Sequence, residues 1–227
     1  MGYCSESEAK AAILEIGRRM YQKDMVAAND GNISVKVGPD EIWATPTGVS
    51  KGFMTEDMLV KINSRGEVLA GSWKTTSEIK MHLRVYAENP QVKAVTHAHP
   101  LTATAFAIAG TPLDQPILAE GVVQLGCVPV APYATPGTQE VPDSIAPYCR
   151  DYNGVLLANH GVLTWGESPM QAFYRLESIE YYAKITVMTQ QVLGSDKKLT
   201  NDQIAALLET RKKLGILTGG MPAGYEG

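Results

Sequence analysis

The stretch that decides the fold is NDGNISVKVGPDEIWATPTG, residues 29–48. Apolar and polar residues alternate in ISVKV (33–37), Gly-Pro-Asp (38–40) signals a turn, and EIWAT (41–45) returns as a second strand. Further along the chain, strand and helix patterns alternate without three tandem βαβ units. We therefore expect a three-layer α/β fold, in which a central mixed, mainly antiparallel sheet carries helices on both faces.

The remaining elements follow from periodicity and capping signals. Helices are predicted over about 5–22, 75–89, 102–109, 168–193 and 201–214, and another ends near Asp151. Strands are predicted at 58–62, 91–100, near 127–130, and at GVLLANHG (154–161) with its partner VLTW (162–165). With no repeat or low-complexity linker, we expect one domain over residues 1–217 and a flexible, Gly- and Pro-containing tail over 218–227.

Composition excludes several classes of function. The net charge is −4, whereas nucleic-acid-binding domains are usually basic, so no nucleic-acid partner is expected. No stretch approaches the roughly 18 uninterrupted apolar residues of a membrane span, and the N-terminus lacks the apolar core of a secretory signal. The three cysteines form no C-x-x-C pair. We expect a soluble, cytoplasmic protein.

Histidine placement is the strongest chemical signal. His97 and His99 stand two residues apart at the end of an apolar strand, so both side chains share a face. His160 is predicted at the end of another apolar strand and is followed by Gly161, which lets backbone come close. Three neutral imidazoles with a position left for water or substrate suit catalytic Zn²⁺. The alternative is that they are ordinary polar residues at strand ends.

Glu78 stands at the predicted start of a helix, after Thr75-Thr76-Ser77. It is either a first-turn acid that offsets the helix dipole or a general base near the metal. His82 lies one helical turn further on, away from any strand end, and is predicted to be structural. Three short polar stretches could bind an anion, although each, taken singly, is more typical of a turn or cap: Gly31-Asn32, Thr47-Gly48 and Thr76-Ser77.

Six motifs occur in a characteristic order: GNISV (31–35), PTG (46–48), TSE (76–78), THAHP (96–100), APYATPGT (131–138) and LLANHG (156–161). Together they resemble the class II aldolase/adducin superfamily over about residues 8–214, and most closely its L-fuculose-1-phosphate aldolase branch. The resemblance implies that His97, His99 and His160 bind zinc, while Glu78 is the acid/base and could also touch the metal in the resting site. It further implies that Gly31, Asn32, Thr47, Gly48, Thr76 and Ser77 hold the substrate phosphate.

The same resemblance implies a C4-symmetric homotetramer with sites at subunit boundaries. The implied reaction is reversible cleavage of a ketose 1-phosphate to dihydroxyacetone phosphate and a short aldehyde. The chain departs from the branch at the aldehyde end, where tyrosines are missing from PILAEGVVQLG (116–126) and near Leu214. Glu120, Leu214 and Tyr225 are candidates there. An apolar Leu214 suits a deoxy or thiomethyl sugar end better than a hydroxylated one, which makes a 5-deoxyribulose or methylthioribulose 1-phosphate a candidate substrate beside L-fuculose 1-phosphate.

Two alternatives remain open. A pentulose-5-phosphate 4-epimerase of the same superfamily would use related chemistry, but such enzymes carry Asp where this chain has Glu78, which favours an aldolase. A non-catalytic interaction module like the adducin head would keep the fold without the metal. The intact set of three histidines and Glu78 counts against it.

Overall fold

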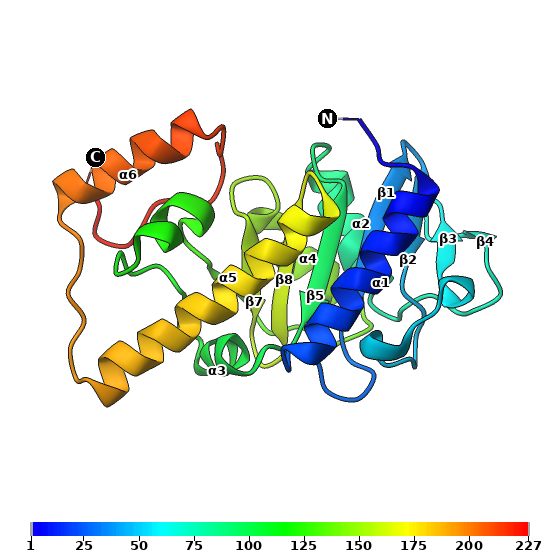
Figure 1. Cartoon of the computed structure of the whole chain (residues 1–227), viewed down its shortest axis with the longest axis horizontal. Coiled ribbons are helices and arrows are strands. Elements are labelled where there is room, and N and C mark those ends of the chain that lie inside the picture. Colours follow the sequence, from blue (N-terminus) through cyan, green and yellow to red (C-terminus); the bar gives the residue numbers. More distant parts are fainter. Residues whose placement is uncertain (1, 227) are drawn as a thin grey trace.

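The computed structural model describes residues 2–226, and an eight-stranded sheet forms its centre (Figure 1). The strands lie in the order β4-β3-β2-β1-β5-β8-β7-β6, and each neighbouring pair is antiparallel except β6 with β7. Their bounds are β1 Asn32–Gly38, β2 Glu41–Ala44, β3 Val60–Ile62, β4 Val68–Ala70, β5 Ala94–Ala98, β6 Val130–Ala131, β7 Gly154–Leu157 and β8 Gly161–Gly166. The predicted mixed, mainly antiparallel sheet is confirmed.

Helices cover both faces of this sheet. In Figure 1, α1 and α5 cross in front of the strands, while α2 and α4 lie behind them. The α-helices are α1 Glu6–Gln22, α2 Ile79–Glu88, α3 Leu101–Ala109, α4 Glu140–Ile145, α5 Pro169–Val187 and α6 Asn201–Lys213. Short 3-10 helices span Lys51–Phe53 (η1), Glu56–Met58 (η2) and Ala146–Tyr148 (η4), and π-helices span Gly121–Leu125 (η3) and Met188–Val192 (η5). The three-layer α/β class is confirmed.

The core is divided by the sheet into two apolar layers. Successive residues of a strand point to opposite faces, so Trp43 packs with Ile13 and Ile16 of α1, while Ile42 packs with Val85 of α2. At its start, α1 is held by a reciprocal pair of hydrogen bonds between Ser5 and Glu8. These helices fix the central strands, whose ends carry the site.

Three local expectations need correction, and two elements were not predicted. His160 does not end a strand but occupies the turn between β7 and β8. The strand near 127–130 is only Val130–Ala131, and the helix predicted to Leu193 changes to π geometry after Val187. Strand β4 and the π-helix η3 were not predicted. All three residues of β4 are exposed, so it has no alternating apolar pattern, and η3 is a run of five residues without helical periodicity.

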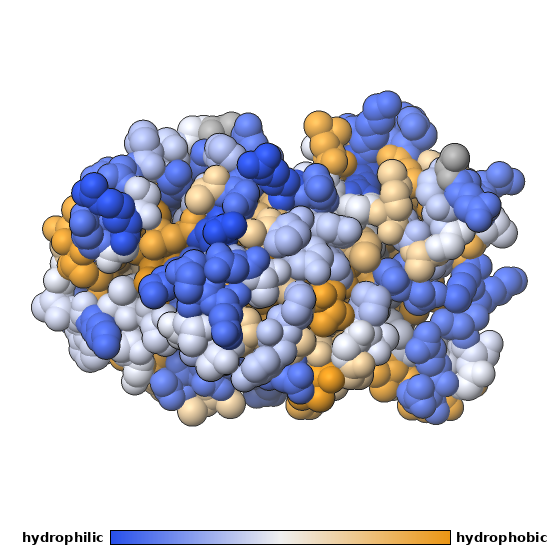
Figure 2. All heavy atoms as spheres, turned by 180° about the vertical axis from the view of Figure 1, so that it is seen from behind, coloured by the Kyte–Doolittle hydropathy of each residue, from blue (hydrophilic) through white to orange (hydrophobic). Residues whose placement is uncertain are grey.

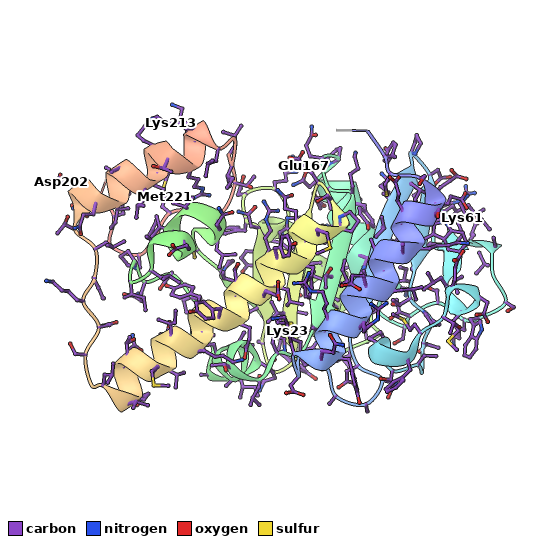
Figure 3. All side chains as sticks on the ribbon, in the orientation of Figure 1. Lys23, Lys61, Glu167, Asp202, Lys213 and Met221 are labelled. Carbon is purple, nitrogen blue, oxygen red and sulfur yellow. The ribbon has the colours of Figure 1, made fainter. Side chains whose placement is uncertain are left out.

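The C-terminal residues lie against the body of the protein. The Cys127 amide donates to Gly219 O at 2.6 Å, and the Ala223 amide donates to Asp114 O at 2.9 Å. Figure 3 shows Met221 between α6 and η3. The domain boundary at 217 and the flexibility of the tail stay predictions.

Hydrophobic and hydrophilic residues are interspersed on the surface of the protein. Seen from behind, hydrophobic residues reach the surface in several separate places among hydrophilic ones (Figure 2). Among residues 2–226, no helix combines the length and the apolar character that crossing a bilayer requires.

Candidate metal centre and active site

Pairing of β5 with β8 brings the three histidines together. Ala98 lies opposite Val162, so His97 and His99 at the end of β5 meet the turn that carries His160. The ring centroids are 4.8–5.1 Å apart, and one nitrogen from each ring lies within 4.8 Å of the others. The structure therefore joins side chains that are about 60 residues apart in the chain into one cluster suited to a metal ion.

In two of the three imidazole rings, Nδ1 is held by a hydrogen bond. His97 Nδ1–H donates to Val162 O at 2.9 Å, and His99 Nδ1–H donates to the carboxylate of Asp30 at 3.3 Å. Such partners orient a metal-binding histidine and set its tautomer. Sequence reasoning missed Asp30, although an acid just before the strand of the GNISV motif could have suggested it.

These tautomers direct the Nε2 lone pairs of His97 and His99 at each other, 3.1 Å apart. Burial lowers the pKa of His97 to about 3 and also lowers the pKa of His99, so both rings are neutral, as metal binding requires. Two acceptors facing each other repel, and a cation between them would relieve that repulsion. The donor set and its geometry fit a divalent ion such as Zn²⁺.

Gly161 makes room for the cluster. A methyl group at this position would lie 2.5 Å from Cδ2 of His99 and 2.6 Å from Ala98 O. The turn before it is closed by the His160 amide, which donates to Leu157 O at 3.0 Å. The predicted need for close backbone approach at Gly161 is borne out by this geometry.

Glu78 faces the histidines from the N-cap position of α2. Its Oε2 lies 3.4 Å from His97 Nε2 and accepts a 2.7 Å hydrogen bond from Asn32. Its Oε1 lies 3.1 Å from His160 Nε2, yet this buried atom has no hydrogen-bond partner. An unpartnered carboxylate oxygen beside imidazole nitrogens is a further feature that a bound cation would satisfy.

Electrostatics keep Glu78 ionised. Burial raises the pKa of this carboxyl, but the adjacent His97 and His160, which attract the carboxylate when protonated, and the hydrogen bond from Asn32 lower it more strongly, so its pKa lies below the usual range. An ionised carboxylate can accept a proton, as a general base must.

A chain of buried polar groups continues behind Glu78. Asn32 Oδ1 lies 2.6 Å from His82 Nε2, and Ser34 Oγ lies 2.7 Å from His82 Nδ1 and 2.8 Å from the Tyr86 hydroxyl. Burial lowers the pKa of His82 to about 4, so this ring is neutral. His82, predicted to be structural, is thus linked to Glu78 through Asn32.

The segments predicted to hold phosphate lie next to Glu78. The Thr47 amide donates to Lys74 O at 2.9 Å, the Thr76 amide donates to Thr45 O at 3.1 Å, and the Ile33 amide donates to Thr45 Oγ1 at 3.2 Å. These bonds place the stretch 45–48 between 31–33 and 74–77. The structure therefore brings the three stretches together, while phosphate binding by Gly31, Asn32, Thr47, Gly48, Thr76 and Ser77 stays a prediction.

Lys51 was given no role from the sequence. Its side chain is buried, and its ammonium donates to Asn29 O at 2.9 Å and to Val49 O, joining the loop before Gly31 to the residue after Gly48. Burial lowers the pKa of Lys51 to about 8, although Asp30 and Glu78 act in the opposite direction. A buried lysine ammonium therefore lies between these loops, a position that the net charge of the sequence does not reveal.

The three residues predicted to contact the aldehyde end of the substrate do not lie at the histidine cluster. Glu120 lines an open cavity of about 680 Å³ beside α5, and Tyr225 lines a different groove of about 640 Å³ beside α6. Leu214 is exposed at the end of α6. No histidine of the cluster lines either cavity, so the described part of one chain does not bring these candidates to the metal centre.

Comparison with known proteins agrees with this site. The family model "Class II Aldolase and Adducin N-terminal domain" matches residues 11–187. The chain therefore belongs to the class II aldolase and adducin family, which confirms the resemblance inferred from the motifs.

Particular relatives carry two activity names. A "3-oxo-tetronate 4-phosphate decarboxylase" of Pectobacterium atrosepticum is 32% identical over 209 residues, covering 89% of this chain and 94% of the relative. An "L-fuculose phosphate aldolase" of Methanocaldococcus jannaschii is 31% identical over 179 residues, covering 79% of this chain and 96% of the relative. A solved "L-fuculose 1-phosphate aldolase" aligns with a TM-score of 0.83 and 30% identity, covering 92% of this chain and 98% of that one.

Proposed function

We propose that this chain is a zinc-dependent lyase that reversibly cleaves a ketose 1-phosphate to dihydroxyacetone phosphate and a short aldehyde. The observation that carries this proposal is the convergence of His97, His99 and His160 on the unpartnered Oε1 of an ionised Glu78. The substrates we favour are L-fuculose 1-phosphate and 5-deoxyribulose or methylthioribulose 1-phosphate.

The residues divide the chemistry among them. Zn²⁺ held by the three histidines would supply a Lewis acid toward the ketose carbonyl. Glu78 would return a proton to the hydroxymethyl carbon of dihydroxyacetone phosphate after cleavage and remove it in the condensation direction. The stretches 31–32, 47–48 and 76–77 would bind the phosphate through amides and hydroxyls, with the Lys51 ammonium beneath them.

A decarboxylase is the second candidate, and the identity to the Pectobacterium atrosepticum relative favours it. Loss of CO₂ from a 3-oxo-tetronate 4-phosphate leaves the same enediolate of dihydroxyacetone phosphate that aldol cleavage produces. Glu78 would then protonate the same carbon, so one site geometry serves both reactions. Only the leaving group, CO₂ or an aldehyde, differs.

A product assay separates these reactions. The zinc-loaded protein is incubated with each ketose 1-phosphate, with 3-oxo-tetronate 4-phosphate and with a pentulose 5-phosphate, while dihydroxyacetone phosphate is followed by coupled NADH oxidation and CO₂ is trapped. Dihydroxyacetone phosphate formed with an aldehyde supports the aldolase, and the same product formed with CO₂ supports the decarboxylase. Conversion of the pentulose 5-phosphate to its C4 epimer identifies an epimerase, and zinc-free, inactive protein would support the interaction module.

We further propose that the active form is a cytoplasmic homotetramer whose sites lie at subunit boundaries. Leu101, two residues after His99, is 79% exposed, and Tyr133 in the APYAT segment is 61% exposed. Large apolar side chains exposed beside a site are typical of a surface that a second copy covers. A neighbouring copy would also supply aldehyde-end groups that one chain does not bring to the histidines. Light scattering of the zinc-loaded protein tests the assembly.

A further inference from the structure

The polar chain behind Glu78 is built from two elements with complementary spacing. Asn32 and Ser34 share one face of β1, because they are two residues apart on a strand. Glu78 and His82 are one turn apart at the start of α2. Each hydrogen bond in the chain is 2.6–2.8 Å long. Asn32, Ser34, His82 and Tyr86 are all buried.

With a neutral His82, one arrangement of protons satisfies this chain. The carboxylate of Glu78 can only accept, so Asn32 must turn its nitrogen toward Oε2 and its oxygen toward His82. His82 must then donate from Nε2, and its bare Nδ1 must accept from the Ser34 hydroxyl. Ser34 in turn accepts from Tyr86. Neutral His82 with its proton on Nε2 fits each of these bonds.

We propose that His82 is a positioning residue for the reaction, because its Nε2–H fixes the Asn32 amide so that it occupies Oε2 of Glu78 and leaves Oε1 as the oxygen that carries the substrate proton. The part about proton transfer rests on the proposed function. The part about orientation rests only on the hydrogen bonds, so the two parts can be tested apart.

Without the His82 donor, only the Glu78 carboxylate would orient the Asn32 amide, and the buried Asn32 oxygen would lose its hydrogen bond. The amide would shift toward another donor, and its hydrogen bond to Oε2 of Glu78 would weaken. Glu78 could then leave the position in which Oε2 is occupied and Oε1 is free. Removal of such a supporting partner typically costs about 10- to 100-fold in activity.

The orientation is tested first without any substrate. In zinc-loaded protein with ¹⁵N-labelled histidine, NMR should show His82 neutral, with the proton on Nε2. A proton on Nδ1 alone, which leaves Nε2 without a proton, would overturn the proposal whatever reaction the enzyme performs.

The functional part is tested by kinetics on the substrate identified above. His82→Phe should lower kcat about 10- to 100-fold with unchanged zinc content, and His82→Gln, which keeps an N–H donor, should recover part of that loss. If His82 acts through Asn32, the double variant His82→Phe/Asn32→Ala should be no slower than Asn32→Ala alone.

Thr186→Val is the matched control. Thr186 is likewise buried, and its hydroxyl donates to Tyr182 O at 2.9 Å within α5, away from the site. This variant should lose stability comparably while keeping kcat. A role through Asn32 would be refuted if the kcat losses of the two single variants multiplied in the His82/Asn32 double variant. Equal kcat losses in His82→Phe and His82→Gln would refute it as well. Should His82→Phe not fold, the NMR result and His82→Gln decide the matter.

Discussion

Gly161→Ala is the sharpest probe of the metal centre. The added methyl would lie 2.5 Å from Cδ2 of His99, whereas packed carbon atoms prefer about 3.5–4.0 Å, so the overlap is about 1 Å. The same methyl would lie 2.6 Å from Ala98 O, which belongs to strand β5. Either the His99 ring or the turn that carries His160 must therefore move by about 1 Å.

Zinc tolerates such a shift poorly, because metal–ligand distances hold to about 0.2 Å. Gly161→Ala should therefore weaken zinc binding and lower kcat by about 10- to 100-fold. Overpacking should also lower the free energy of unfolding by about 1–3 kcal/mol. Zinc affinity by chelator competition, kcat and a thermal melt measure these effects.

Gly154→Ala is the control, since its methyl would be similarly crowded. It would lie 2.9 Å from Thr164 Cγ2 and 3.0 Å from Ile179 Cδ1, at the end of β7 opposite the turn that carries His160. This variant should lose stability but keep its zinc affinity. Wild-type zinc affinity and kcat in Gly161→Ala would refute the claim that this glycine makes room for the metal centre.

Three further predictions concern Glu78, Lys51 and Leu101. Glu78→Gln should reduce kcat at least about 100-fold while metal analysis still finds zinc; full activity would remove Glu78 from its role. Because the pKa of Lys51 is about 8 in the folded protein against its usual 10.5, the unfolded chain binds the extra proton between these pH values. The stability of the wild type relative to Lys51→Met should therefore rise by roughly 3 kcal/mol from pH 8 to 10.5 and level off above, and urea titrations showing no such rise would contradict the buried ammonium. Leu101→Glu should dissociate the proposed tetramer in light scattering, and an intact tetramer would place the interface elsewhere.

Local chemistry made part of the site predictable. The spacing of His97 and His99 on one strand and the glycine after His160 are local features, so a metal-binding role could be inferred from them. The hairpin of β1 and β2 was equally predictable, because alternation and a turn signal lie within one short stretch. The motifs in order then led to the family that the comparisons confirm.

Other features depend on which segments pack together. His160 joins the cluster because β5 and β8 pair in a register that places Ala98 opposite Val162. Asp30 behind His99, and Asn32 between Glu78 and His82, become partners only when distant segments meet. No local periodicity encodes such contacts.

The charge states of buried groups also separate what the sequence determines from what the tertiary structure decides. The sequence determined a net charge of −4, a histidine pair with metal-binding spacing, and an acid at the start of a helix. Only the tertiary structure decided that Lys51 is buried between two loops, that His82 is neutral, and that Glu78 stays ionised beside the histidines. The physical reason is that burial and neighbouring dipoles, which arise from packing, determine where charge is stable.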